Sequence, residues 1–179
     1  MGSWHAIGRS HQGVLVMQRG DVVTGLKLLR AGLEEAGERR FTTLRFFTLY
    51  LAEALGRAGK IAEGLDLIAD AIDFSERSEE HWLIAELLRL KGKLLLMLAK
   101  PGGLAAAEDC FQQALDWARR QSVLSWELRA ATSLARLWRD QGRATEANAL
   151  LQPVLERFSE GSATADVAGA QRLLGELTD

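Results

Sequence analysis

Small residues recur along this chain at a nearly constant interval, and this regularity limits the available folds more than any other feature. Gly25, Gly64, Ala107 and Ala147 each stand near the start of a stretch with helical apolar spacing, at intervals of 39, 43 and 40 residues. A period of about 40 residues is typical of helical solenoids, in which one pair of helices stacks on the next. The sequence therefore predicts stacked helical hairpins that offer a long surface to another molecule.

The segments between the turns predict helices throughout the chain. Apolar residues recur at three- and four-residue steps, and glycine-bearing turns such as Gly20-Asp21 and Gly142-Arg143 separate the segments. We expect an all-α fold, a right-handed TPR-like superhelix (alpha solenoid), in which residues 1–179 form a single domain. Its elements are four antiparallel hairpins at about 4–36, 41–75, 79–120 and 124–158, and a C-terminal capping helix at about 163–177.

Small residues also mark the tight contact expected inside each hairpin. A small residue on the first helix is expected to face one on the second, so that the two backbones can approach closely. The predicted pairs are Gly13 with Gly25, Ala52 with Gly64, Gly92 with Ala107, and Ala135 with Ala147. This register resembles the tetratricopeptide repeat, and it predicts that replacing either Gly92 or Ala135 with leucine overpacks the hairpin.

A more specific resemblance covers essentially the whole chain. Residues 86–92, 107–111, 114–121 and 125–137 in particular look like the C-terminal tetratricopeptide region of large bacterial signalling ATPases. These STAND-type regulators, common in rhizobia-like bacteria, combine a winged-helix or nucleotide-cyclase domain, a P-loop ATPase and such a repeat array. The resemblance implies that the chain is the regulatory region of a larger protein, and that its partners include other domains of that protein.

Charge and cysteine content narrow the classes of partner. The formal net charge is −2, from 22 basic and 24 acidic residues, so neither nucleic acid nor a membrane surface is an expected partner. Cys110 is the only cysteine, which favours a cytoplasmic location, and we expect it to be a small buried residue. The longest apolar run, residues 94–99, is far shorter than the roughly 20 residues of a membrane span.

The sequence lacks the patterns that would indicate an enzyme. It contains no G-x-x-x-x-G-K-[ST] phosphate loop. His5, His11 and His81 are scattered, without the spacing of a metal site, and the acidic pairs stand at helix ends, where solvation explains them. We therefore expect no catalytic residues, no cofactor and no metal.

The remaining candidate for function is the concave groove lined by the first helices of successive hairpins. The residues expected to contact a partner there are Arg89, Lys93, Arg129, Thr132, Arg136 and Arg139, four of which lie on one helix face at steps of three, four and three. The same positions in the earlier hairpins are Ser10, Val14, Met17, Phe46, Leu49 and Glu53. The groove would thus grade from apolar to basic, and its basic end would bind an acidic segment or an anionic ligand.

Several alternatives stay open at this point. The arginine face is also compatible with an ordinary solvated surface. The chain also resembles the superhelical sensor domain of maltotriose-responsive transcription activators, which would make it a small-effector receptor; a deep apolar groove would favour that reading, and an open basic groove favours a peptide. Trp82, Trp117 and Trp126 either wedge neighbouring repeats together or contact a partner. An apolar face on the first hairpin would pair two copies as a homodimer.

Overall fold

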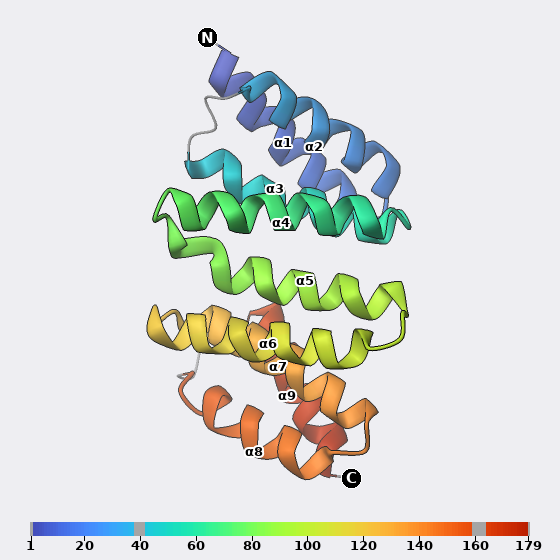
Figure 1. Ribbon diagram of the computed structural model, residues 1–179, viewed down its shortest axis with the longest axis vertical. Helices are drawn as coiled ribbons and strands as arrows, with labels where there is room; N and C mark the ends of the chain where they lie inside the picture. Colours follow the sequence, from blue (N-terminus) through green and yellow to red (C-terminus); the bar gives the residue numbers. More distant parts are fainter. Residues whose placement is uncertain (1, 38–41, 159–163, 179) are drawn as a thin grey trace. The chain divides into compact units, whose positions relative to one another are not determined.

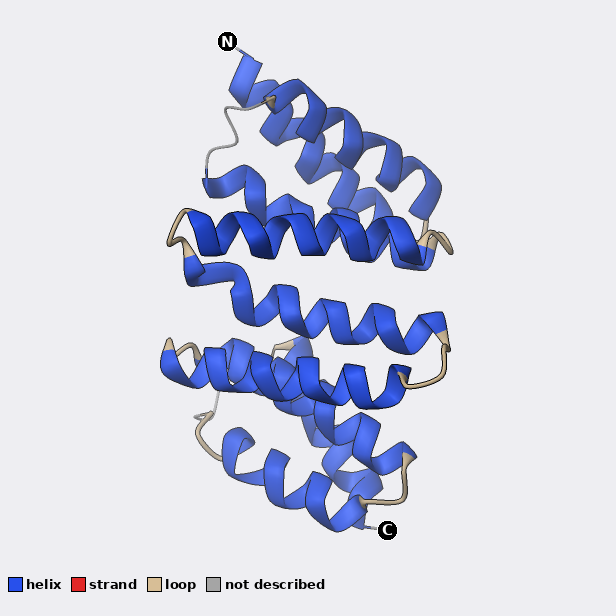
Figure 2. Cartoon of the chain, in the orientation of Figure 1, coloured by secondary structure: helices blue, strands red, loops and turns tan. Residues whose placement is uncertain are grey.

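The computed structural model describes residues 2–37, 42–158 and 164–178, and these residues form helices and turns without a strand (Figure 2). The helices are α1 (Gly2–Gln18), α2 (Val22–Ala36), α3 (Thr42–Arg57), α4 (Ile61–Arg77), α5 (Ile84–Leu98), α6 (Gly103–Arg120), α7 (Leu124–Asp140), α8 (Ala144–Leu155) and α9 (Ala165–Thr178), with a short 3-10 helix at His81–Leu83 before α5 (Figure 1). The predicted all-α class is confirmed. The fifth helix begins at Ile84 rather than at residue 79, because the chain first makes the 3-10 turn.

The chain divides into two compact units. The first unit comprises residues 1–83 with 97–99, and the second comprises residues 84–96 with 100–179. The expectation of a single domain over residues 1–179 stays a prediction. None of the helices described is long and apolar enough to cross a membrane.

In the first unit, α1 and α2 approach so closely that the glycines at their contact leave no room for a Cβ atom. A Cβ atom at Gly25 would lie 2.9 Å from the carbonyl oxygen of Gly13, and one at Gly32 would lie 2.9 Å from that of Ala6. Real Cβ atoms do not tolerate contacts this short, so only glycine fits at Gly25 and Gly32 without a shift of the backbone. The predicted pairing of Gly13 with Gly25 is confirmed.

The prediction that the first two hairpins expose six groove residues is wrong for four of them. Ser10, Val14, Met17 and Leu49 are all buried. Val14 and Met17 belong to one apolar cluster with Phe47, because α3 packs against α1 at this face. The hydroxyl of Ser10 donates to the carbonyl oxygen of Ala6 within its own helix. This part of α1 therefore belongs to the core of the first unit.

In the second unit, Gly92 has a different neighbour from the one predicted. The three atoms nearest to a Cβ at Gly92 belong to the ring of Phe111, at 2.5 to 3.0 Å, and not to Ala107. Phe111 lies one turn further along α6, and its ring fills the space that the missing side chain leaves. Ala107, Ala135 and Ala147 are all fully buried, as expected for small residues at hairpin contacts.

Helix α9 closes the second unit, where it packs against α7 and α8. Its apolar residues Val167, Ala170 and Leu173 form a buried stripe, whereas Leu174 and Leu177 are partly exposed. The predicted start of the second hairpin, at about residue 41, and that of the capping helix, at about residue 163, lie outside the described residues.

Candidate functional site

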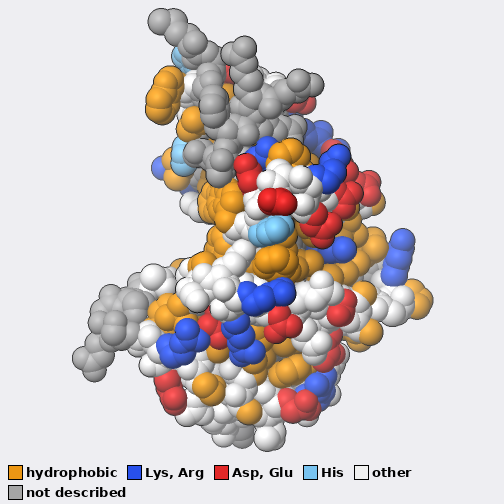
Figure 3. Space-filling view, turned by 60° about the vertical axis from the view of Figure 1, so that its left-hand side comes forward, with side chains coloured by type: hydrophobic (Ala, Val, Ile, Leu, Met, Phe, Trp, Pro, Cys, Tyr) orange, Lys and Arg blue, Asp and Glu red, His pale blue; other side chains and the backbone are white. Residues whose placement is uncertain are grey.

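Five of the six predicted partner contacts line one cavity in the second unit. This cavity of about 190 Å³ is formed by α5, α7 and α9, and its walls include Arg89, Lys93, Arg129, Thr132 and Arg136. Asp166 and Gly169 of α9 complete it, together with Ser133 and Ala165. Figure 3 shows Lys and Arg side chains gathered among Asp and Glu side chains on this unit, in the lower part of the view.

The sixth predicted contact, Arg139, lines a second cavity of about 220 Å³ between α7 and α9. This cavity shares Arg136 and Gly169 with the first, and Arg172 and Glu176 of α9 also line it. The two cavities are therefore neighbours along the α7 arginines. The arginine stripe of α7 faces α9 along this boundary.

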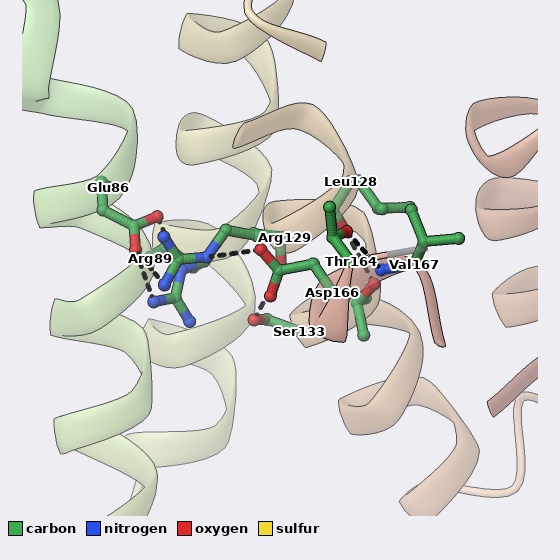
Figure 4. Close-up of polar contacts among 9 residues, drawn as sticks. Glu86, Arg89, Leu128, Arg129, Ser133, Thr164, Asp166 and Val167 are labelled. Atoms are coloured by element: carbon green, nitrogen blue, oxygen red, sulfur yellow. Dashed lines mark hydrogen bonds and ion pairs between the residues drawn. The ribbon is translucent and has the colours of Figure 1, made fainter. Parts of the chain in front are cut away.

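A buried carboxylate on α5 organises the first cavity. Glu86 is 4% exposed, and its two oxygens accept hydrogen bonds from Nη2 and Nε of Arg89 at 2.7 and 2.8 Å. Nη2 of Arg129 lies 2.7 Å from Oε1 of the same carboxylate, and its Nε lies 3.8 Å from Oδ2 of Asp166 (Figure 4). The alternating charges thus link α5 to α7 and α7 to α9.

These contacts change the roles of two predicted residues. Arg89 is 7% exposed and makes a bidentate pair with Glu86, so its guanidinium is committed inside the fold. Thr132 is also buried, and its hydroxyl donates to the carbonyl oxygen of Leu128 at 2.7 Å. Both residues shape the wall of the cavity from within. The surface that a partner can reach is formed by the other four predicted contacts.

Helix α9 is held to α7 by an ion pair near each of its ends. Arg129 pairs with Asp166, and Arg139 pairs with Glu176, so two residues ten apart on α7 meet two residues ten apart on α9. The two helices therefore run in the same direction. The pKa of Arg139 is raised, first by its hydrogen bond to Asp140 and then by Glu176, so this guanidinium remains charged.

Arg136 lies between these two pairs and differs from both neighbours. It is exposed, and within the described part of the chain it has no hydrogen bond or ion pair; the same holds for Arg172 on α9. A Cβ atom at Gly169 would lie 3.7 Å from Nη2 of Arg136, so α9 passes directly beside this guanidinium. Two arginines from facing helices therefore line one cavity with their charges unmatched.

Sequence reasoning missed the contribution of α9. Asp166, Arg172 and Glu176 fall within the predicted capping helix at about 163–177, but none of them is among the expected partner contacts. The sequence does indicate that these three residues form a polar face, since they lie off the apolar stripe of Val167, Ala170 and Leu173. What could not be seen was that this polar face lies beside the arginines of α7.

Other charged groups of the second unit serve the packing of its outer helices. Glu127 on α7 is buried and pairs with Arg119 at 3.0 Å and with Arg157 at 2.5 Å. Glu108 on α6 accepts hydrogen bonds from Nε1 of Trp138 at 2.7 Å and from Arg143 at 2.9 Å. Burial alone would raise the pKa of Glu108, but these hydrogen bonds outweigh it and lower the pKa.

The described residues contain no group of three or more histidine, cysteine or acidic side chains placed to hold a metal ion. Cys110 is buried, as expected, and this burial raises the pKa of its thiol. A buried, protonated thiol is a poor nucleophile. The guanidinium and ammonium groups at the α5, α7 and α9 surface can bind anions.

Comparisons with known proteins establish the fold. No family model matches the sequence, and no curated protein matches it. A crystal structure of a putative kinesin light chain from Podospora anserina with nearly identical TPR-like repeats is similar, with a TM-score of 0.70 at 16% identity over 99% of this chain and 86% of that chain. BtubC (BKLC) from P. vanneervenii is similar with a TM-score of 0.71 at 20% identity, over 92% of this chain and 68% of that chain. The chain therefore has the fold of TPR-like helical repeats.

Proposed function

We propose that this chain is a non-catalytic protein-binding module, and that the α5, α7 and α9 surface of the second unit binds an acidic segment of a partner protein. The surplus of positive charge at this surface carries the proposal. Its two cavities are lined by six basic residues, Arg89, Lys93, Arg129, Arg136, Arg139 and Arg172, and by two acidic residues, Asp166 and Glu176. Even when Glu86 and Asp140 are added, the positive charges outnumber the negative by two.

The shape and lining of the cavities favour a peptide over a small effector. Pockets for small molecules typically enclose roughly 300–1,000 Å³ and are mostly apolar. The cavities here are smaller, at about 190 and 220 Å³, and charged side chains dominate their walls. A segment that lies across both cavities can place one acidic side chain in each. These two charged cavities do not offer the apolar walls that the alternative, a small-effector sensor domain, would need.

The resemblance of the sequence to signalling ATPases identifies the first partner to test. We propose that the chain is the C-terminal regulatory region of a larger bacterial cytoplasmic protein of this class, and that the acidic segment belongs to its ATPase or output domain. The first unit offers a separate contact for a second copy, because Trp4 and Leu15 on α1 are 80% and 55% exposed. Analytical ultracentrifugation of the wild type and a Trp4→Ala variant tests that homodimer.

A titration with a labelled acidic peptide tests the binding function. We expect a glutamate-rich peptide to bind the wild-type chain and to lose affinity steeply as salt is added, because exposed charges are screened over about 10 Å at 0.1 M. Arg136→Ala should weaken binding, and so should the Arg129→Ala/Arg136→Ala double variant, whereas Arg19→Ala in the first unit serves as the control. Equal affinities for all four proteins, with circular dichroism unchanged, would return the arginines to an ordinary solvated face.

A further inference from the structure

We infer that the cavity between α7 and α9 is a binding site for a phosphate monoester, with Arg136 and Arg172 as its two ligands. The inference rests on the proposed function and specifies the group that the bound segment carries. The phosphate is most simply a phosphorylated side chain within the acidic segment, since the cavity adjoins the one that contains Lys93 and Arg129.

The first argument is the distribution of charge. The neighbouring arginines of α7 are already neutralised, Arg129 by Glu86 and Asp166, and Arg139 by Asp140 and Glu176. Arg136 and Arg172 have no such partner within the described residues, although they lie on facing helices and line the same cavity. Two positive charges at one cavity repel each other, and an anion placed between them removes that repulsion.

The second argument is the match between the charge and the number of acceptor atoms. A phosphate monoester carries a charge of about −1.5 to −2 at neutral pH and has three strong acceptor oxygens. Each guanidinium presents a planar fork of donors that fits two such oxygens. A single carboxylate carries only one negative charge, so it would leave one positive charge of the two arginines unbalanced even where both contact it.

The third argument is the space beside the two arginines. Gly169 lines the same cavity, and a Cβ atom there would already contact Nη2 of Arg136 at 3.7 Å. A larger side chain at this position would extend into the space that an anion needs. The cavity volume of about 220 Å³ leaves ample room for a phosphate group.

The test is calorimetric titration of the full chain with phenyl phosphate in a phosphate-free buffer. We expect saturable binding at one site, and each of Arg136→Gln and Arg172→Gln should weaken it by about tenfold or more, because charge-assisted hydrogen bonds are lost. Arg19→Gln makes the same change of charge outside the cavity and should bind as the wild type does. Benzoate, with a single charge on a similar ring, should bind more weakly than phenyl phosphate.

A second variant separates the shape of the site from its charge. Gly169→Leu retains every charged residue but fills the cavity, so it should abolish binding of phenyl phosphate. Circular dichroism reports whether α9 remains folded in this variant. If phenyl phosphate does not bind the wild type saturably, or binds the Arg136 and Arg172 variants as tightly as the wild type, the inference is overturned.

Two peptides distinguish this inference from the proposed function. One is an acidic peptide with a central serine, and the other is the same peptide with phosphoserine. A gain in affinity on phosphorylation that requires Arg172 supports both proposals. Equal binding of the two peptides, without binding of phenyl phosphate, overturns the phosphate site and leaves the acidic-segment function standing. If phenyl phosphate binds but neither peptide does, the result supports a site for a small organic phosphate and overturns the protein-binding function.

Discussion

The two units of this chain hold their helices together in different ways. The α1 and α2 hairpin of the first unit is joined by close backbone contact at glycines, whereas the second unit adds buried carboxylates, Glu86 and Glu127, to its apolar packing. The ion pairs of the first unit involve partly or largely exposed side chains, such as Arg9 with Glu35 and Lys60 with Glu63. The first unit exposes apolar side chains such as Trp4 and Leu15 on α1. The second unit instead presents arginines without an ionic partner among the described residues, Arg136 and Arg172, which can bind an acidic partner.

The largest effect should come from breaking the buried ion pair of the second unit. Among the described residues, Arg89→Ala leaves the buried Glu86 carboxylate with Arg129 as its remaining partner, so the loss should reach at most the roughly 3–5 kcal/mol of a fully uncompensated buried charge. Urea unfolding measures this loss. The double variant Glu86→Leu/Arg89→Met should recover most of the stability, because it leaves no uncompensated charge. A loss below about 1 kcal/mol in Arg89→Ala would show that electrostatics do not hold this unit together.

The next effect should come from adding a methyl group where the helices of the first unit touch. Gly25→Ala places a Cβ atom 2.8 Å from that of Met17, and such overpacking costs about 1–3 kcal/mol. Gly8→Ala in α1 is the matched control, since nothing lies within 4 Å of its new Cβ atom. That control should stabilise the helix by up to about 1 kcal/mol. Similar thermal midpoints for the two variants would contradict the close contact.

Gly92 offers the same steric test in the second unit. Gly92→Ala should destabilise the chain by about 1–3 kcal/mol, because the ring of Phe111 occupies the place of the new methyl group. Phe111→Leu alone should also be destabilising, but the double variant should lose less than the sum of the two single variants. Additive losses in this cycle would mean that the two residues do not share the space.

A smaller effect should appear in the pH dependence of the second unit. The pKa of Glu108 is lower in the folded chain than its ordinary value of 4.5, so the charged carboxylate stabilises the folded state above that pH. This contribution is lost as the pH falls through the lower, folded pKa. Glu108→Gln should therefore be less stable than the wild type at pH 7, by no more than about 1 kcal/mol, and this difference should shrink toward pH 3. A difference that grows on acidification would contradict the assignment.

The smallest effect should follow removal of a surface pair in the first unit. Glu63 on α4 pairs with Arg30 and Lys60, and all three side chains are more than a third exposed. Glu63→Gln should change the stability by less than about 0.5 kcal/mol, because water screens such pairs. Unfolding at low and high salt should give nearly the same difference. A loss comparable to that of Arg89→Ala would remove the contrast between the units.

The sequence by itself determined the helical repeat, because the apolar spacing that makes a helix amphipathic is local and can be read along one segment. It also located the hairpin contact at Gly13 and Gly25, and it placed Arg129, Arg136 and Arg139 on one face. These features depend on residues within a few turns of each other or on the repeat period, so no knowledge of distant packing was needed.

Only the tertiary structure decided which of these charges remain available. Glu86 and Arg89 are three residues apart, but nothing in their spacing shows that the pair is buried and shared with Arg129 about 40 residues later in the chain. The roles of Asp166, Arg172 and Glu176 likewise depend on where α9 lies against α7. Burial and ion pairing are properties of the surroundings of a side chain, and helices distant in sequence supply those surroundings.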